Sequence, residues 1–121
     1  MIRVVLVEDN RSFRRAMELL LDLEPDIEVV ASVDNGSQAA EACVEHRPDV
    51  ALLDYRLPGL DGVQATRAIR RAVPETRVVV LTASAKGSEV RELLDAGVVT
   101  CLTKDTELSD IIAAIRDAAR R

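Results

Sequence analysis

Residues 49–62 read Asp-Val-Ala-Leu-Leu-Asp-Tyr-Arg-Leu-Pro-Gly-Leu-Asp-Gly, an apolar run that stops at a carboxylate and passes into a turn. A second nearly unbroken apolar run covers residues 77–81. Such runs are typical of central strands that are buried on both faces of a sheet. Because stretches of helical period separate the runs, the pattern favours a parallel sheet covered by helices on both faces.

The alternation of strand and helix patterns occurs five times along the chain. We expect strands over residues 2–7, 27–33, 49–53, 77–81 and 98–103. The helices between and after them are expected to end before Pro25, before Pro48, before Pro74, at Gly97 and near Arg120. Asn35 and Asp61 each stand three residues before a glutamine, which is a reciprocal capping pattern at a helix start. The fourth helix is expected to begin at Ser88 and the fifth near Thr106.

Two helices carry clear apolar stripes. The first is expected to face the core with Phe13, Ala16, Met17, Leu20 and Leu21, and to turn Arg11, Arg14, Arg15, Glu18 and Asp22 outward. The fifth is expected to bury Leu108, Ile111, Ile112 and Ile115.

Length and composition indicate one ordinary globular domain. A chain of 121 residues buries roughly two thirds of its unfolded surface, and 48% hydrophobic with 31% charged residues excludes a disordered chain. The net charge of −5 speaks against nucleic-acid binding by this chain, because phosphate contacts need clustered Lys and Arg. No apolar run approaches the roughly 20 residues of a membrane span, and the N-terminus lacks the pattern of a signal peptide, so we expect a cytoplasmic protein. Cys43 and Cys101 have no paired metal spacing and are expected to be small buried groups.

Polar side chains stand where the expected strands end. Glu8 and Asp9 follow the first strand, Asp54 the third, Thr82 the fourth and Lys104 the fifth. The carboxyl ends of parallel strands share one edge of a sheet, where ligands bind in open α/β folds. Three crowded carboxylates repel one another unless a cation neutralises them. The pattern therefore predicts a hard divalent ion, with Thr82 and Lys104 left to hold an anion.

These motifs together resemble a response regulator receiver domain over essentially all 121 residues. They are Val7-Glu8-Asp9-Asn10, Leu53-Asp54-Tyr55-Arg56-Leu57-Pro58-Gly59-Leu60-Asp61-Gly62, Leu81-Thr82-Ala83 and Leu102-Thr103-Lys104. The resemblance implies a flavodoxin-like, doubly wound α/β sandwich, in which a five-stranded parallel sheet ordered 2-1-3-4-5 is flanked by five helices. We expect one receiver domain over residues 1–121 and no output domain in this chain.

The resemblance also implies the chemistry of two-component signalling. Asp54 would accept a phosphoryl group from a sensor histidine kinase, with Thr82 and Lys104 assisting. A Mg²⁺ ion (or Mn²⁺) would bind Glu8, Asp9, Asp54 and the backbone carbonyl of Arg56. Such a domain is not an enzyme in the usual sense, since it catalyses only its own phosphorylation and slow dephosphorylation.

A narrower resemblance follows from Asp105, which replaces the proline that most receivers carry after the lysine. Together with residues 21–30, this is similar to receivers fused to LuxR-type helix-turn-helix (NarL/FixJ-like) regulators. Phosphorylation is then expected to change the surface of the fourth helix and fifth strand and to control a DNA-binding output domain. Homodimerisation on phosphorylation is left open.

One position departs from the family. Resembling receivers usually carry Tyr or Phe three residues before the lysine, where the ring moves on activation, but this chain has Cys101. We therefore expect Thr82 and the loop over residues 83–87 to carry the response.

Two alternatives use the same residues. A phosphatase of the haloacid dehalogenase kind also has a strand-end Asp nucleophile with Mg²⁺, but it needs an Asp two residues later, where this chain has Arg56. A pseudo-receiver that only binds proteins would not need the complete acidic set. The receiver interpretation is therefore favoured.

Overall fold

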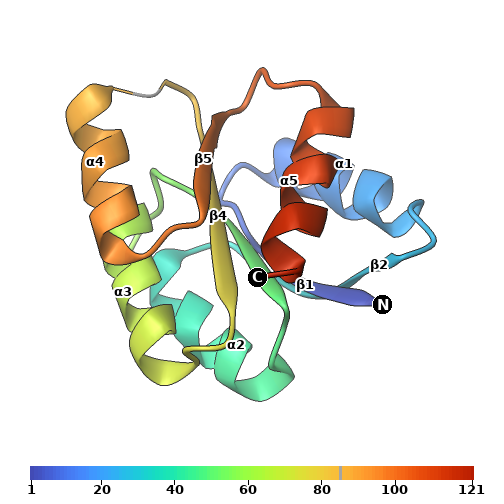
Figure 1. The fold of residues 1–121 in the computed structure, drawn as a ribbon, viewed down its shortest axis with the longest axis horizontal. Helices are drawn as coiled ribbons and strands as arrows, with labels where there is room; N and C mark the ends of the chain where they lie inside the picture. The colour runs from blue at the N-terminus through green and yellow to red at the C-terminus, as the bar shows by residue number, and fades with distance from the viewer. Residues whose placement is uncertain (85) are drawn as a thin grey trace.

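The computed structural model describes residues 1–84 and 86–121 as a parallel sheet between two layers of helices (Figure 1). The strands are β1 (Ile2–Val7), β2 (Ile27–Val33), β3 (Val50–Asp54), β4 (Arg77–Thr82) and β5 (Thr100–Thr103). They pair in the order β2-β1-β3-β4-β5, and every pair is parallel. The flavodoxin-like order expected from the resemblance is confirmed.

The helices divide between the two faces of the sheet. They are α1 (Arg11–Asp22), the 3-10 turn η1 (Gly36–Gln38), α2 (Ala39–His46), α3 (Gly62–Ala72), α4 (Gly87–Ala96) and α5 (Leu108–Ala119). α1 and α5 lie on one face of the sheet, and α2, α3 and α4 lie on the other (Figure 1). Their side chains form two separate cores with those of the strands. None of the helices among residues 1–84 and 86–121 has the length and apolar character needed to cross a membrane.

Alternation along the central strands fills both cores. In β3, Ala51 and Leu53 face α2, α3 and α4, whereas Val50 and Leu52 face α1 and α5. All four are at most 1% exposed, and burial of each Val or Leu side chain contributes about 1.5–3 kcal/mol. Because side chains alternate with a period of two, Asp54 continues the row of Val50 and Leu52 and points to the side of α1 and α5.

The element ends differ from the sequence expectations where local hydrogen bonds compete. β5 begins at residue 100 and not 98, after Gly97 has closed α4 with a φ of +108°. The expected start of α4 at Ser88 is wrong by one residue, because the Lys86 carbonyl already accepts from the Val90 N–H at 3.0 Å and α4 begins at Gly87. α5 begins two residues later than expected, since Thr106 N–H donates to the Thr103 carbonyl in a turn.

The two capping predictions have different outcomes. Asp61 and Gln64 cap α3 reciprocally, as expected, with backbone-to-side-chain distances of 2.9 and 3.0 Å. The Asn35 side chain accepts from the Gln38 N–H at 3.0 Å, but the described bonds include no return from Gln38. The segment forms a single 3-10 turn, and α2 starts at Ala39.

The apolar stripe of α1 is narrower than expected. Met17 and Leu21 are buried and Phe13 partly so, but Ala16 and Leu20 are exposed. α1 packs over β2 and β1 at the sheet edge, so only a thin row of its side chains meets the core. The prediction that Arg14 faces outward is wrong, because its side chain turns back and donates to the Glu8 carbonyl at the end of β1. In α5, Ile111, Ile112 and Ile115 are buried as expected, while Leu108 is only partly buried.

The loop after β3 is held by a close backbone approach. Gly36 N–H donates to the Pro58 carbonyl at 2.9 Å, and a Cβ atom at Gly36 would overlap the carbonyl of Leu60. Gly59 has a φ of +84°, a conformation that L side chains rarely adopt. These glycines let the loops after β2 and β3 meet, which fixes the chain between Asp54 and α3.

Native-state thiol chemistry tests the strand order. Cys43 lies in α2, which packs on β2 and β1, whereas Cys101 lies in the opposite edge strand, and both are free thiols. Burial raises the pKa of Cys43 to about 12, and burial and the charge of Glu89 raise the pKa of Cys101. At pH 8 we expect Ellman's reagent to leave Cys43 unmodified and to modify Cys101 slowly, until urea exposes both. A tryptic disulfide peptide joining the two cysteines would contradict the strand order.

Candidate functional site

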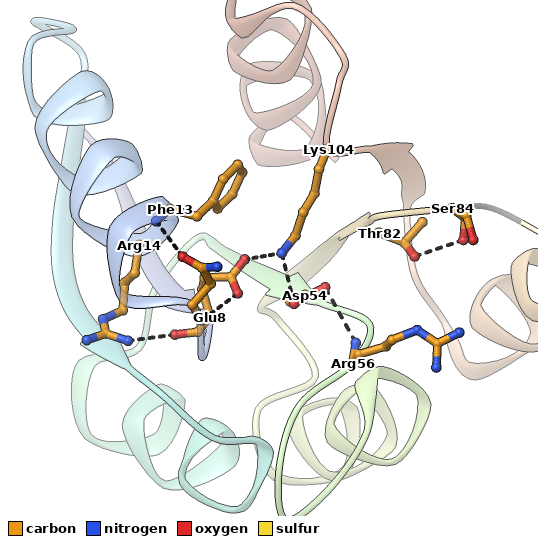
Figure 2. A network of polar contacts seen from close by, with 9 residues as sticks. Glu8, Phe13, Arg14, Asp54, Arg56, Thr82, Ser84 and Lys104 are labelled. Atoms are coloured by element: carbon orange, nitrogen blue, oxygen red, sulfur yellow. Dashed lines mark hydrogen bonds and ion pairs between the residues drawn. The ribbon is translucent and has the colours of Figure 1, made fainter.

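The carboxyl ends of β1, β3 and β5 bring three charged side chains together (Figure 2). The Nζ of Lys104 donates to Glu8 Oε1 at 2.7 Å and to Asp54 Oδ2 at 3.0 Å. Glu8 is 2% exposed and Asp54 7%, so both carboxylates lie largely out of water. Opposite charges attract more strongly when solvent is excluded, which strengthens both ion pairs. Through them Lys104, after β5, is tied to the ends of β1 and β3, neither of which pairs with β5 in the sheet.

Asp9 completes an acidic group at the edge of this ion pair. Glu8, Asp9 and Asp54 offer carboxylate oxygens that all lie within 4.8 Å of one another. Asp9 is exposed and borders a cavity of about 430 Å³, which Tyr55 and Arg56 also line. Three carboxylates face one ammonium, and oxygen ligands of this kind suit a hard divalent cation. The acidic residues expected to bind a metal are thus brought together.

The charges of the site are shifted by burial and by hydrogen bonds. Burial raises the pKa of Glu8, against the hydrogen bonds from Lys104 and from the Asn10 N–H, and the pKa stays above its usual range. Burial also works to lower the pKa of Lys104, but its bonds to Glu8 and Asp54 outweigh this and raise the pKa. Lys104 is therefore an ammonium throughout the neutral range.

The chain from Glu8 to Arg14 builds one wall of the site. Glu8 Oε2 accepts from the Asn10 N–H at 3.0 Å, and the Glu8 carbonyl accepts from Arg14 Nη1 at 2.8 Å (Figure 2). The Asn10 side chain in turn caps α1 by accepting from the Phe13 N–H. Asn10 and Arg14 were not among the residues expected at the site. The available sequence signal was an asparagine directly before a helical pattern, which is a common cap.

Phe13 is a further residue that the sequence pattern did not place at the site. Its ring centroid lies 4.7 Å from Lys104 Nζ, on the side of α1 (Figure 2). The helical spacing predicts only that Phe13 faces inward. No local pattern pairs it with a lysine after the last strand, so the contact follows from the fold alone.

Arg56 and Thr82 lie near the site, but their hydrogen bonds go to other partners than the expected metal ion and phosphoryl group. The Arg56 N–H donates to Asp54 Oδ1 over a long 3.4 Å, and its guanidinium lies 3.8 Å from Glu89 of α4. The Thr82 hydroxyl donates to the Ser84 carbonyl at 3.0 Å, within its own loop (Figure 2). Part of the expected response loop, Ala85, lies outside the described residues. Metal binding by the Arg56 carbonyl stays a prediction.

Comparison with known protein families and with curated proteins gives the same family in both cases. Residues 4–116 match the family described as the response regulator receiver domain. Transcriptional regulatory protein LiaR of Bacillus subtilis is 35% identical over 120 residues, which cover 99% of this chain and 57% of LiaR. The chain spans about half the length of the curated relatives it matches.

Solved structures agree in fold. The receiver domain of the putative response regulator NarL from Mycobacterium tuberculosis has a TM-score of 0.94 and 38% identity, with 98% of this chain and 96% of that chain covered. A LuxR-family two-component response regulator from Aurantimonas has a TM-score of 0.92 and 27% identity, with 98% and 84% covered.

Replacement of Lys104 tests the ion pair. Lys104→Met leaves two buried carboxylates without a counter-charge, and we expect unfolding in urea with EDTA at pH 7.5 to require about 1–3 kcal/mol less than in the parent. Lys86→Met is the matched control, since Lys86 is exposed and is the other lysine of the chain.

The loss of stability in Lys104→Met should depend on pH and on Mg²⁺. Without the lysine, burial holds the pKa of Glu8 still further above its usual 4.5, so the folded variant binds more protons than the unfolded chain above that pH. Stability therefore falls as pH rises, and the loss should be smaller at pH 5 than at pH 7.5. Millimolar Mg²⁺ should also reduce it. An equal loss in all three conditions would contradict the charge explanation.

Proposed function

This chain belongs to the response regulator receiver domain family, and from that premise we propose that Asp54 is its phosphoacceptor. Its relatives include LuxR-family transcriptional regulators, and the family is one of signalling domains. The observation that carries the proposal is the contact of Asp54 with Lys104 inside an acidic group that borders an open cavity. In this proposal Asp54 is the nucleophile and Lys104 the cation, and a donor would enter through the cavity that Asp9 of the same acidic group lines.

Phosphoryl transfer in this proposal uses the less engaged oxygen of Asp54. Oδ2 is held by Lys104 at 3.0 Å, whereas Oδ1 has only the 3.4 Å bond from the Arg56 N–H. Oδ1 therefore keeps more of its electron density for attack on phosphorus. The new P–O bond forms as the bond from phosphorus to the donor nitrogen of a phosphohistidine breaks. A carboxylate needs no base for this reaction, because it carries no proton.

The charge of the incoming group is met by Lys104 and by a metal. Lys104 can move its hydrogen bond from Oδ2 to a phosphoryl oxygen without leaving the site. The carboxylates of Glu8, Asp9 and Asp54, with the Arg56 carbonyl, would hold Mg²⁺ or Mn²⁺. When bound, such an ion neutralises the acidic group and the developing charge on the phosphoryl oxygens.

Thr82 supplies the response in this proposal. Its hydroxyl donates to the Ser84 carbonyl, so bonding to a phosphoryl group would require that hydrogen bond to break, which would release this tie on the loop. The loop leads into α4, which also contacts Arg56 through Glu89. Cys101 is too small for the ring movement of related receivers, and the α4–β5 surface would change through the loop.

The signalling context completes the proposal. A sensor histidine kinase would supply the phosphoryl group in the cytoplasm, and residues 1–121 would act as a single receiver domain that controls a DNA-binding output domain. With a net charge of −5, this chain would not bind the nucleic acid itself. The phosphatase alternative is not favoured, because Arg56 stands where that chemistry needs an acid.

Asp54→Asn tests the phosphoacceptor directly. We expect acetyl phosphate with Mg²⁺ to add one phosphoryl mass to the parent protein and none to the variant, because the amide is a poor nucleophile. Asp34→Asn makes the same change in an exposed acid after β2 and should be phosphorylated like the parent. Phosphorylation of Asp54→Asn at the parent rate, seen by intact mass, would exclude the assignment.

A second pair of variants tests how the signal leaves the site. We expect beryllofluoride to change amide hydrogen exchange in residues 83–90 of the parent, much less in Thr82→Ala, and equally in Cys101→Ala. The reason is that, in this proposal, the Thr82 hydroxyl donates to the phosphoryl mimic, whereas the Cys101 side chain takes no part. A change confined to β5 and lost in Cys101→Ala would show that the thiol position carries the signal.

A further inference from the structure

We propose that Phe13 is a positioning residue for phosphoryl transfer, and that the face of its ring keeps the Lys104 ammonium beside Asp54. This inference rests on the proposed function, because it gives Phe13 a role in the same reaction. It adds a residue that the sequence motifs do not include.

The surroundings of the ammonium carry the inference. Lys104 Nζ contacts Glu8 at 2.7 Å, Asp54 at 3.0 Å and the Phe13 ring centroid at 4.7 Å. A cation within about 6 Å of an aromatic centroid is attracted by the negative face of the ring. The Lys104 side chain is 22% exposed, so water only partly weakens this attraction. Figure 2 shows the ring beside the lysine side chain, with the two carboxylates beyond its ammonium.

The ring itself is held in place. Phe13 packs against the core on the side of α1 and α5. Its backbone N–H donates to the Asn10 side chain at 3.0 Å in the first turn of α1. The Phe13 backbone is thus held by the segment that supplies Glu8, and packing against the core holds the ring beside Lys104.

An aromatic face can hold the Lys104 ammonium without neutralising its charge, which a carboxylate cannot do. Glu8 attracts Lys104 strongly, but it neutralises the ammonium and so competes with an incoming phosphoryl group. The ring attracts the ammonium through its quadrupole and carries no formal charge. It therefore lowers the entropy of the long lysine side chain while its positive charge stays available. Lys104 can then exchange Asp54 Oδ2 for a phosphoryl oxygen with little reorganisation.

The sequence allows this to be tested at one ring without a change of shape. Phe13 is the single phenylalanine of the chain, so growth on fluorinated phenylalanine replaces that ring alone. The series of one, two and three ring fluorines weakens the negative face stepwise and alters ring size little. We expect the rate constant for phosphorylation by saturating acetyl phosphate with Mg²⁺ to fall at each step, by about fivefold in total.

Two substitutions of Phe13 complement the series of fluorinated proteins. Phe13→Tyr keeps an aromatic face and should stay within about twofold of the parent, whereas Phe13→Leu should fall at least as far as the trifluorinated protein. A merely structural role predicts rates that follow thermal stability and not the number of fluorines.

The outcomes separate this inference from the proposed function. A parent protein that gains no phosphoryl mass would overturn the proposed function, and this inference with it. A parent that is phosphorylated, with rates that do not change across the fluorine series, would overturn the role of Phe13 alone.

Discussion

The Lys104 ammonium lies between two buried carboxylates, and the arrangement of the site depends on this contact. Glu8 follows β1, Asp54 ends β3 and Lys104 follows β5, so the ion pairs join three strand ends of one sheet. They meet because the inward alternation of β3 and β5 continues past Leu52 and Leu102 to Asp54 and Lys104. The apolar rows that stabilise the sheet also aim the charged side chains.

The same contact leaves the site short of positive charge. The ammonium pairs with Glu8 and Asp54, which are largely withdrawn from water, and Asp9 adds a third carboxylate within 4.8 Å of them. A divalent cation would restore the balance, and the cation and the lysine would then both face the negative charge of an incoming phosphoryl group. The Thr82 hydroxyl donates to the Ser84 carbonyl and would have to exchange this bond for one to the phosphoryl group. The proposed switch is therefore a change of hydrogen-bond partners at the ends of β4 and β5.

Much of this could be predicted from the sequence, because the apolar runs of the central strands and the polar residues at their ends are local patterns. The sheet order came from the resemblance, and the site residues from their places after the strands. Other features depend on long-range packing. Arg14 turns back to Glu8, Lys104 lies closer to Glu8 than to Asp54, and Phe13 faces Lys104. The starts of α4 and α5 differ from the expected Ser88 and Thr106 because single backbone hydrogen bonds at Lys86 and Thr103 decide them.

Chemical trapping of the phosphorylated residue tests the central claim most directly. Borohydride reduces an acyl phosphate on aspartate to homoserine, and peptide mass analysis locates the change. After incubation with acetyl phosphate and Mg²⁺, we predict homoserine at position 54 and at no other acidic residue. Homoserine at Asp9 or at another acid, with Asp54 unchanged, would contradict the assignment of Asp54 as phosphoacceptor.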